Sequence, residues 1–461
     1  MGKCVPSFLQ YDQNFYHLFV RLLVKRFFCL EINSTFEFFT AVMRCITLSK
    51  IKRYQFNPGR HRHGRRGGGP FMTILVIVAV VVLIFIGWNI YVPLHQAIKG
   101  TKNTSTSTSS TASKTTVSSH PTTSSKASSS HPAQSATSSG VKAVYLSSGT
   151  LTQTSMDQIL SSAKNAGIKT AIVELKGEDG ALHYTSKISQ VQNNGLVAQG
   201  ALDGAAIIQE IQKYGMTPAA DISCFKDPLA ANVIRTASVH NSTSHDITWL
   251  DESNNRWLNP YAADATQYLT DLTTEITSLG FKQIYLSNVQ FPSGKQKHVW
   301  YGNNVGTKES ALQTFVSSIA QKAHTAGATV TLVLPADAAL GSGEATLGQD
   351  QDPYSYGADA VSPLFVPSSV TGVTAGGTAI PDPAAGLSVS VNAAASALKT
   401  QNADKYKNDI PFILAGTGTT TQTATTADIN AQISALKSLG MTNYVLYSST
   451  ATYALNGVTV S

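Results

Sequence analysis

The feature that most constrains the fold is a regular alternation of short apolar segments and helical segments over residues 141–461. The apolar segments are rich in β-branched residues, which favours strands. Eight strands are predicted, at Val141–Leu146, Thr170–Leu175, Thr217–Ile222, Gln283–Ser287, Thr329–Leu334, Ala358–Ser362, Pro411–Ala415 and Asn443–Tyr447. Helices are expected between them, for example at Ser155–Asn165, Gly204–Tyr214, Ala262–Ser278, Ser310–Thr325 and Thr426–Ser438.

Glycines mark the ends of several of these helices, because a glycine can close a helix in the left-handed conformation. The glycines in question are Gly167, Gly215, Gly280, Gly327 and Gly440. Near-continuous apolar strands that alternate with helices imply a parallel sheet covered by helices. Eight such units favour a closed (β/α)8 barrel, the TIM-barrel architecture. The alternative is an open doubly wound sheet, but no glycine-rich phosphate loop follows Val141–Leu146 to support a nucleotide-binding version.

A long apolar segment precedes this domain, at Phe71–Val92. At about 1.5 Å per residue it spans roughly 33 Å, which is enough for the ~30 Å hydrocarbon core of a bilayer. Trp88 and Tyr91 lie at one end, as interface aromatics do. A cleavable signal peptide is the alternative, but its apolar part is shorter and ends in small residues. We therefore expect an uncleaved transmembrane helix over 71–92, with the bilayer as its partner.

Charge predicts the orientation of that helix. Residues 1–70 contain twelve Lys and Arg against three Asp and Glu, whereas residues 141–461 contain eighteen against twenty-four. Positive flanks stay in the cytoplasm, so the N-terminus is expected inside the cell and the large domain outside the membrane. The basic residues lie beside an apolar segment, so anionic lipid is a better partner for them than nucleic acid.

Two further regions complete the expected organisation. Residues 1–70 form a basic cytoplasmic region in which the stretch Phe15–Leu30 is either an amphipathic surface helix or a sequence upstream of the true start. Residues 93–140 form a linker, and 25 of the 40 residues from Thr101 to Gly140 are Ser or Thr. Such a composition cannot bury enough apolar surface to fold, so a disordered spacer is expected.

Working residues of a barrel lie at the carboxyl ends of its strands and in the loops that follow. Four acids at such positions are candidates for catalysis: Asp221, Glu174, Asp179 and Asp337. Eight other residues are candidates for substrate contacts: Lys176, Lys226, Asp227, Asn288, Gln290, Asp350, Trp257 and Tyr261. For some of them a structural role is an open alternative. Asp227 before Pro228 is also typical of a helix cap, Glu174 and Lys176 could form an ion pair, Asp350 could brace a loop, and Trp257 could pack in a core or a loop.

Several segments at these strand ends resemble a glycoside hydrolase family of bacterial barrels related to α-amylase-like enzymes. The segments are IVELKGEDG, FKDPLAA, WLNPY, LSNVQFPSG, LGQD and AVSPLFVPS, and the resemblance covers about residues 141–455. It implies a (β/α)8 barrel that acts on glycans. The fourth strand departs from the family pattern, because the expected nucleophile Asp, the Tyr and the Arg are here Ser287, Asn288 and Gln290. Asp221 stands where the family has Arg, and Asn259 stands where it has Asp.

Glycoside cleavage normally needs two carboxyl groups that flank the bond. The chain therefore either uses a relocated pair among its remaining acids or binds glycan without hydrolysing it. A cell-wall, environmental or peptidoglycan-associated polysaccharide is the expected partner. No HExxH motif or clustered metal-ligand spacing is present, so neither a metal nor a cofactor is expected. Cys224, the lone cysteine of the domain, is expected to be a buried apolar residue.

Overall fold

The computed structural model describes residues 140–418 and 422–460. The basic region 1–70, the segment 71–92 and nearly all of the linker 93–140 lie outside these residues, and their expected roles stay predictions. In the part of the chain that is described, no helix combines the length and the apolarity needed to cross a membrane.

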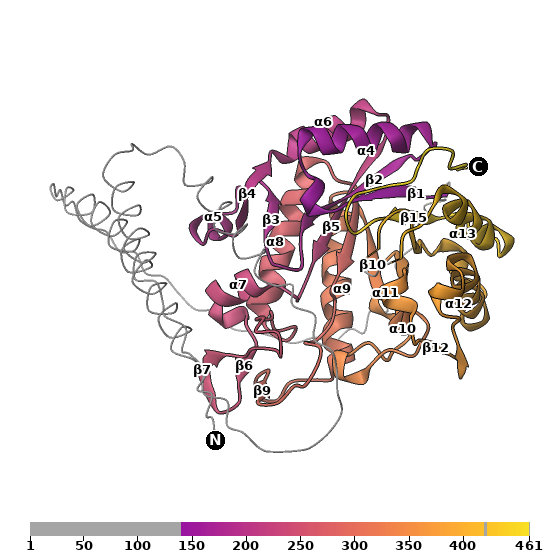
Figure 1. Cartoon of the computed structure of the whole chain (residues 1–461). Helices are drawn as coiled ribbons and strands as arrows, with labels where there is room; N and C mark the ends of the chain where they lie inside the picture. Colours follow the sequence, from indigo (N-terminus) through magenta and orange to yellow (C-terminus); the bar gives the residue numbers. More distant parts are fainter. Residues whose placement is uncertain (1–139, 419–421, 461) are drawn as a thin grey trace, which may run out of the picture. The chain divides into compact units, whose positions relative to one another are not determined.

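Eight parallel strands close into a barrel (Figure 1). The first strand pairs with both the second and the last, which closes the cylinder and shows that the open-sheet alternative is wrong. The barrel strands are β1 (Lys142–Leu146), β2 (Thr170–Lys176), β5 (Thr217–Ser223), β8 (Gln283–Ser287), β10 (Thr329–Pro335), β11 (Ala360–Phe365), β14 (Phe412–Leu414) and β15 (Tyr444–Tyr447).

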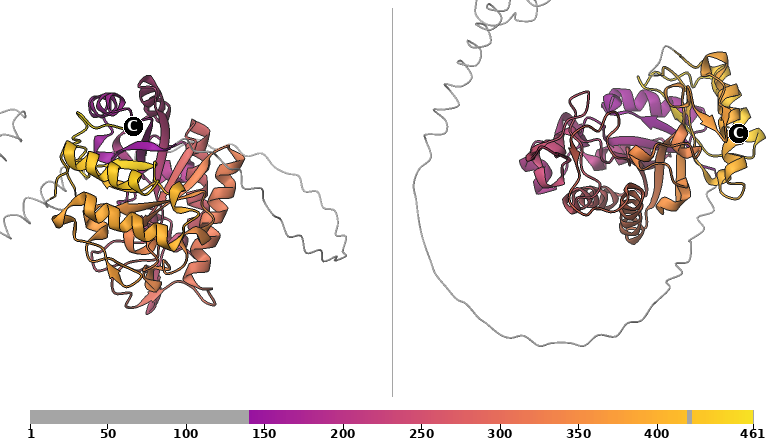
Figure 2. Two further views of the ribbon diagram at one scale, coloured as in Figure 1. Left: turned by 90° about the vertical axis from the view of Figure 1, so that its right-hand side faces the viewer. Right: turned by 90° about the horizontal axis from the view of Figure 1, so that it is seen from below.

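Helices surround the strands, as two further views show (Figure 2). The longer ones are α4 (Gln153–Asn165), α6 (Gly204–Lys213), α8 (Ala263–Leu279), α9 (Lys308–Thr325), α12 (Leu387–Gln401) and α13 (Thr426–Ser438). In α6 the isoleucines at positions 207, 208 and 211 lie on one buried face, and each buried side chain of this size contributes about 1.5–3 kcal/mol. The five predicted helix-ending glycines all have positive φ, between 66° and 119°.

Smaller elements arise from the connections. Strands β3 (Leu182–Tyr184) and β4 (Val197–Leu202) extend the sheet beyond β2. The loops after β5 and β8 supply a separate three-stranded antiparallel sheet. Its strands are β6 (His240–Asn241), β7 (Ser244–Thr248) and β9 (Val299–Trp300). The remaining short elements are α5 (Ser189–Asn193), α7 (Pro228–Val233), α10 (Ala336–Ala339), α11 (Pro367–Val370), β12 (Thr374–Ala375) and β13 (Thr378–Ala379).

The barrel interior is a packed core rather than a pore. It contains the buried side chains of Ala143, Tyr145, Ile172, Ala219, Tyr285, Val333, Val366, Ile410, Phe412 and Val445. A second and larger core lies between the strands and the helices. Because side chains alternate along a strand, the residues next to Ile172 and Ala219 on the same face continue the interior toward the carboxyl ends. Those residues are Glu174 and Asp221.

Candidate active site

Two acids stand side by side inside the barrel. Glu174 on β2 and Asp221 on β5 are register partners in adjacent parallel strands, so their side chains lie on the same face of the sheet. Asp221 is 5% exposed, and Glu174 is half-buried. The structure therefore brings together two of the four acids that the sequence suggested for catalysis.

Asp221 is held from the first strand. The hydroxyl of Tyr145 donates a hydrogen bond of 2.8 Å to Asp221 Oδ2, whereas Oδ1 is buried and has no hydrogen-bond partner among the described residues. Burial and then the charge of Glu174 raise the pKa of Asp221 to about 7, while the side chains of Tyr145 and Ser287 act in the opposite direction. A carboxyl group with this pKa still carries its proton in much of the population near neutral pH.

Glu174 is oriented by the chain that follows β1. The backbone N–H of Ser148 donates to Glu174 Oε2 at 2.7 Å. Tyr447 is half-buried, and burial and then the charge of Glu174 raise the pKa of its hydroxyl. The rings of Tyr447 and Tyr145 have centroids 5.6 Å apart. The surroundings of Glu174 thus include the backbone N–H of Ser148 and the ring of Tyr447.

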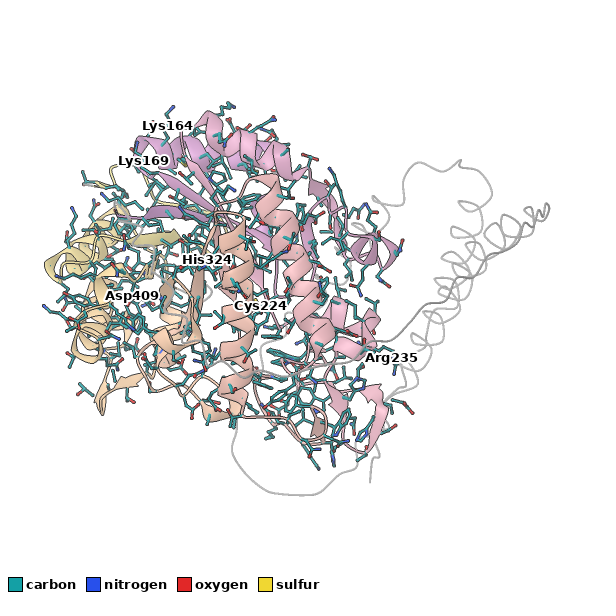
Figure 3. All side chains as sticks on the ribbon, turned by 180° about the vertical axis from the view of Figure 1, so that it is seen from behind. Lys164, Lys169, Cys224, Arg235, His324 and Asp409 are labelled. Atoms are coloured by element: carbon teal, nitrogen blue, oxygen red, sulfur yellow. The ribbon has the colours of Figure 1, made fainter. Side chains whose placement is uncertain are left out.

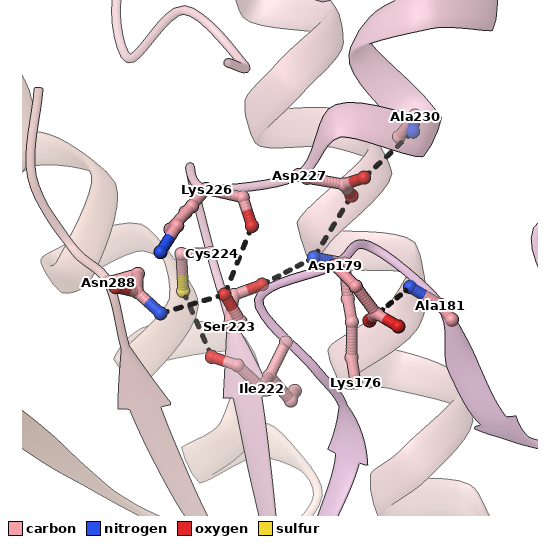
Figure 4. Close-up of polar contacts among 10 residues, drawn as sticks. All are labelled: Lys176, Asp179, Ala181, Ile222, Ser223, Cys224, Lys226, Asp227, Ala230 and Asn288. Carbon is pink, nitrogen blue, oxygen red and sulfur yellow. Dashed lines mark hydrogen bonds and ion pairs between the residues drawn. The ribbon is translucent and has the colours of Figure 1, made fainter. Parts of the chain in front are cut away.

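Lys176 and Asp227 form a buried ion pair, which corrects their assignment as substrate contacts. Lys176 Nζ lies 2.9 Å from Asp227 Oδ2, and both side chains are 0% exposed (Figure 4). Asp227 Oδ1 also accepts from the N–H of Ala230 at 2.7 Å, so the helix-cap reading of Asp227 is confirmed. The suggested pairing of Lys176 with Glu174 is wrong, because the β-strand register shifts between these two residues.

Two other polar candidates near the carboxyl ends, Lys226 and Asn288, contact protein groups. Lys226 pairs with Glu178 at 2.8 Å, and this pair is partly exposed at the rim. Asn288, which has a φ of 51°, donates from Nδ2 to Ser223 Oγ at 3.0 Å. Gln290 is half-buried in the loop after β8. These residues shape the loops around the carboxyl pair.

Within the described residues, no hydrogen bond joins the remaining acids to the pair. Asp179 is exposed in the turn after β2, where its Oδ1 accepts from the N–H of Ala181 at 3.0 Å. Asp337 lies in the first turn of the short helix α10 after β10. Asp350 is exposed in the loop before β11.

The two aromatic candidates lie away from the carboxyl pair. Trp257 is 1% exposed, and its indole N–H donates to Asp251 Oδ2 at 2.9 Å. It packs in the small core under the β6–β7–β9 sheet, so its faces are closed to a sugar, and a substrate contact is wrong for it. Tyr261 instead lines a cavity of about 330 Å³ between α8 and α9 in the helical layer, where its hydroxyl donates to Gly306 O at 2.8 Å.

Two further expectations concern thiol and metal chemistry. Cys224 is buried and its thiol lies near Ile222 O (Figure 4), which confirms the prediction of a buried small residue. Within residues 140–418 and 422–460, no group of three or more His, Cys, Asp or Glu side chains is arranged to hold a metal ion.

A family model described as "Putative glycosyl hydrolase domain" matches residues 143–453, which is nearly the whole barrel. The chain belongs to this glycosyl hydrolase family. No match was found among curated proteins.

Many solved structures resemble the glycosyl hydrolase domain, among them two of low sequence identity. The PgaB (BpsB) glycoside hydrolase domain from Bordetella bronchiseptica is 11% identical, with 68% of this chain and 95% of that chain covered and a TM-score of 0.49. A hypothetical protein from Ruminiclostridium thermocellum is 21% identical, with 41% and 96% covered and a TM-score of 0.38.

Three groups beside the acids of this glycosyl hydrolase domain were not predicted from the sequence. Tyr145, Tyr447 and the backbone N–H of Ser148 surround the acid pair, yet none was a candidate. A signal for two of them exists, since tyrosines stand near the carboxyl ends of the first and last predicted strands. The role of the Ser148 N–H has no signal in the sequence, because every residue except proline carries that group.

Proposed function

We propose that the barrel hydrolyses glycosidic bonds with Asp221 as the proton donor and Glu174 as the second carboxyl group. The observation that carries this proposal is the register pairing of the two acids on adjacent strands inside the barrel, where Asp221 has a pKa of about 7. Two carboxyl groups with different environments are the usual requirement for glycoside cleavage.

The chemistry assigns one step to each group. Asp221 gives its proton to the glycosidic oxygen while the bond between that oxygen and the sugar carbon breaks. In one route Glu174 attacks the sugar carbon as that bond breaks, and a water molecule that gives its proton to the now ionised Asp221 then releases the sugar from Glu174. In the other route Glu174 removes a proton from a water molecule that attacks the sugar carbon directly. The hydrogen bond from Tyr145 keeps the Asp221 carboxyl in one orientation during the transfer. The half-buried Tyr447 ring offers a face on which a sugar could stack.

A second candidate function is glycan binding without hydrolysis. The burial of Asp221 favours it, because a carboxyl group that is only 5% exposed must become accessible before it meets a glycosidic oxygen. Ser287 at the end of the fourth barrel strand favours it as well, since a serine cannot replace an ionised carboxylate there.

The proposal extends to location and substrate. We infer a single-pass protein anchored by residues 71–92, with its N-terminus in the cytoplasm and the barrel outside, separated from the membrane by the linker 93–140. Support comes from the excess of positive charge in residues 1–70 and the apolar run that follows it. A barrel held there would act on a cell-wall, environmental or peptidoglycan-associated polysaccharide.

One experiment separates the two functions. The full-length protein in detergent is incubated with a panel of wall and environmental polysaccharides, and both reducing-end release and glycan binding are measured. Release of reducing ends supports hydrolysis, whereas binding without release supports the second candidate. If no polysaccharide of the panel is cleaved or bound, both candidate functions are refuted. Protease treatment of intact cells tests the location, because an external barrel is digested and a cytoplasmic one is protected.

A further inference from the structure

Lys176 leaves the barrel interior because of an irregularity in β2. Glu174 pairs with Asp221, but two residues later Lys176 pairs with Ile222 rather than with Ser223. Ile222 belongs to the outer core between strands and helices, so the shift turns Lys176 from the inner face to the outer face. The bulge therefore keeps Glu174 inside while it directs the lysine toward the loop after β5.

On that outer side Lys176 joins two strand ends. Its Nζ donates to the backbone oxygen of Ser223 at 2.5 Å and pairs with Asp227 Oδ2 at 2.9 Å (Figure 4). Ser223 lies two residues beyond Asp221, just as Lys176 lies two residues beyond Glu174. The lysine consequently connects the strand that carries one acid to the strand that carries the other, immediately after both acids.

The connection extends to neighbouring elements. Asp227 caps α7 through the N–H of Ala230, and Asn288 at the end of β8 donates to the Ser223 hydroxyl. The turn after β2 also lies directly on the Asp227 carboxylate, because a Cβ added to Gly180 would come 2.2 Å from Asp227 Oδ1. Three successive strand ends are thus held through one small polar cluster.

Stability alone is a weak reason for such a pair. Removing two charges from water carries a large free-energy cost, and well-packed apolar residues often replace a buried ion pair with no loss of stability. A buried pair is better explained by the arrangement that it fixes.

We propose that Lys176 is a positioning residue that holds Glu174 and Asp221 side by side through its bonds to Ser223 O and Asp227. As far as it concerns catalysis, this rests on the proposed glycoside hydrolysis. Lys176 itself meets no substrate, because it is fully buried. If the link is lost, the end of β5 is free to move relative to β2, and the two acids lose their register.

The test uses the full-length protein with two double variants. Lys176→Met with Asp227→Leu replaces the pair by apolar side chains of similar size. Lys176→Gln with Asp227→Asn removes both charges but keeps a donor for Ser223 O and an acceptor that can cap α7. Thermal unfolding establishes that each variant is folded. The kinetic constants and the titration of Asp221, followed by ¹³C NMR of labelled Asp carboxyl groups, are then compared with wild type, and Asp221→Asn identifies the signal.

A misplacement of about 1 Å costs about 100-fold in rate, so the Met/Leu variant should lose kcat by about that factor while KM changes little. Its Asp221 should titrate at a lower pH, because a loosened strand end admits water. The Gln/Asn variant should recover most of the lost kcat and titrate like wild type. A folded Met/Leu variant with unchanged kcat and unchanged Asp221 titration would overturn the proposal.

The controls separate the two ideas. Wild-type protein that hydrolyses no glycan refutes the proposed function, and the titration of Asp221 in the variants then decides the positioning role by itself. Should the Met/Leu variant fail to fold, the Gln/Asn variant decides. If Asp221 in the Gln/Asn variant titrates at the same pH as in wild type, the result supports a link that acts through hydrogen bonds. If it titrates at a clearly lower pH, the result contradicts the proposal.

Discussion

A second buried acid offers a test of the structure far from the carboxyl pair. Asp409 precedes β14 at the amino end of the barrel and is 0% exposed (Figure 3). Its Oδ2 accepts a hydrogen bond of 2.6 Å from Tyr354, and the ammonium group of Lys405 lies 4.9 Å from the centre of the Tyr354 ring. Burial raises the pKa of Asp409 to about 7, and the hydrogen bond from Tyr354 offsets only part of that rise.

This pKa makes stability depend on pH. In the unfolded chain Asp409 loses its proton near pH 4, whereas in the folded barrel it keeps the proton up to about pH 7. The folded state therefore binds more protons between these values, and the free energy of unfolding falls as pH rises through that window. A pKa difference of about three at about 1.4 kcal/mol each gives a loss of about 4 kcal/mol.

Asp409→Asn removes this loss, because an amide does not ionise and its oxygen can still accept from Tyr354. The difference in free energy of unfolding between variant and wild type should be small near pH 4 and should grow to about 4 kcal/mol in favour of the variant by pH 8. Urea unfolding followed by tryptophan fluorescence across this range measures it. A difference that does not change with pH, or a variant less stable at pH 8, would refute the reasoning.

Two more predictions follow from contacts around the acid pair. Gly180→Ala places a methyl group against the Asp227 carboxylate at a φ of 84°, so it should lower the free energy of unfolding by about 2–4 kcal/mol. The control Gly195→Ala, with a φ of 63° and no atom within 4 Å of the added methyl group, should lower it by only about 1–2 kcal/mol. Equal losses for the two variants in urea unfolding would contradict this prediction. Tyr145→Phe removes a hydrogen bond that lowers the pKa of Asp221, so the pKa of Asp221 should rise in the variant. The alkaline limb of the pH–rate profile should then move to higher pH. A limb that stays in place or moves to lower pH would argue against Asp221 as the acid.

The barrel was predictable from the sequence because its local signals agree with one another. The fourth strand, Gln283–Ser287, has the predicted bounds, and the helix at Thr426–Ser438 does as well. The sixth strand was predicted at Ala358–Ser362. It instead runs from Ala360 to Phe365, because pairing with β10 and β14 holds it extended.

The site was only partly predictable. Asp221 and Glu174 could be placed at strand ends, but the register that pairs them depends on contacts between strands and not on local sequence. The bulge after Glu174 turned Lys176 away from the interior, and nothing in the sequence marks that shift. Trp257 was misassigned because the small sheet that buries it is built from very short strands in two separate loops.

If Glu174 and Asp221 together cleave the glycosidic bond, variants of either residue must lose activity on the same substrate. Once a hydrolysed glycan is found, kcat is measured for wild type, Glu174→Gln and Asp221→Asn, with Glu210→Gln on the outer helix α6 as the matched control. We expect each of the first two variants to lose about a thousandfold in kcat, whereas the control keeps the wild-type value. Wild-type kcat in either Glu174→Gln or Asp221→Asn would contradict it.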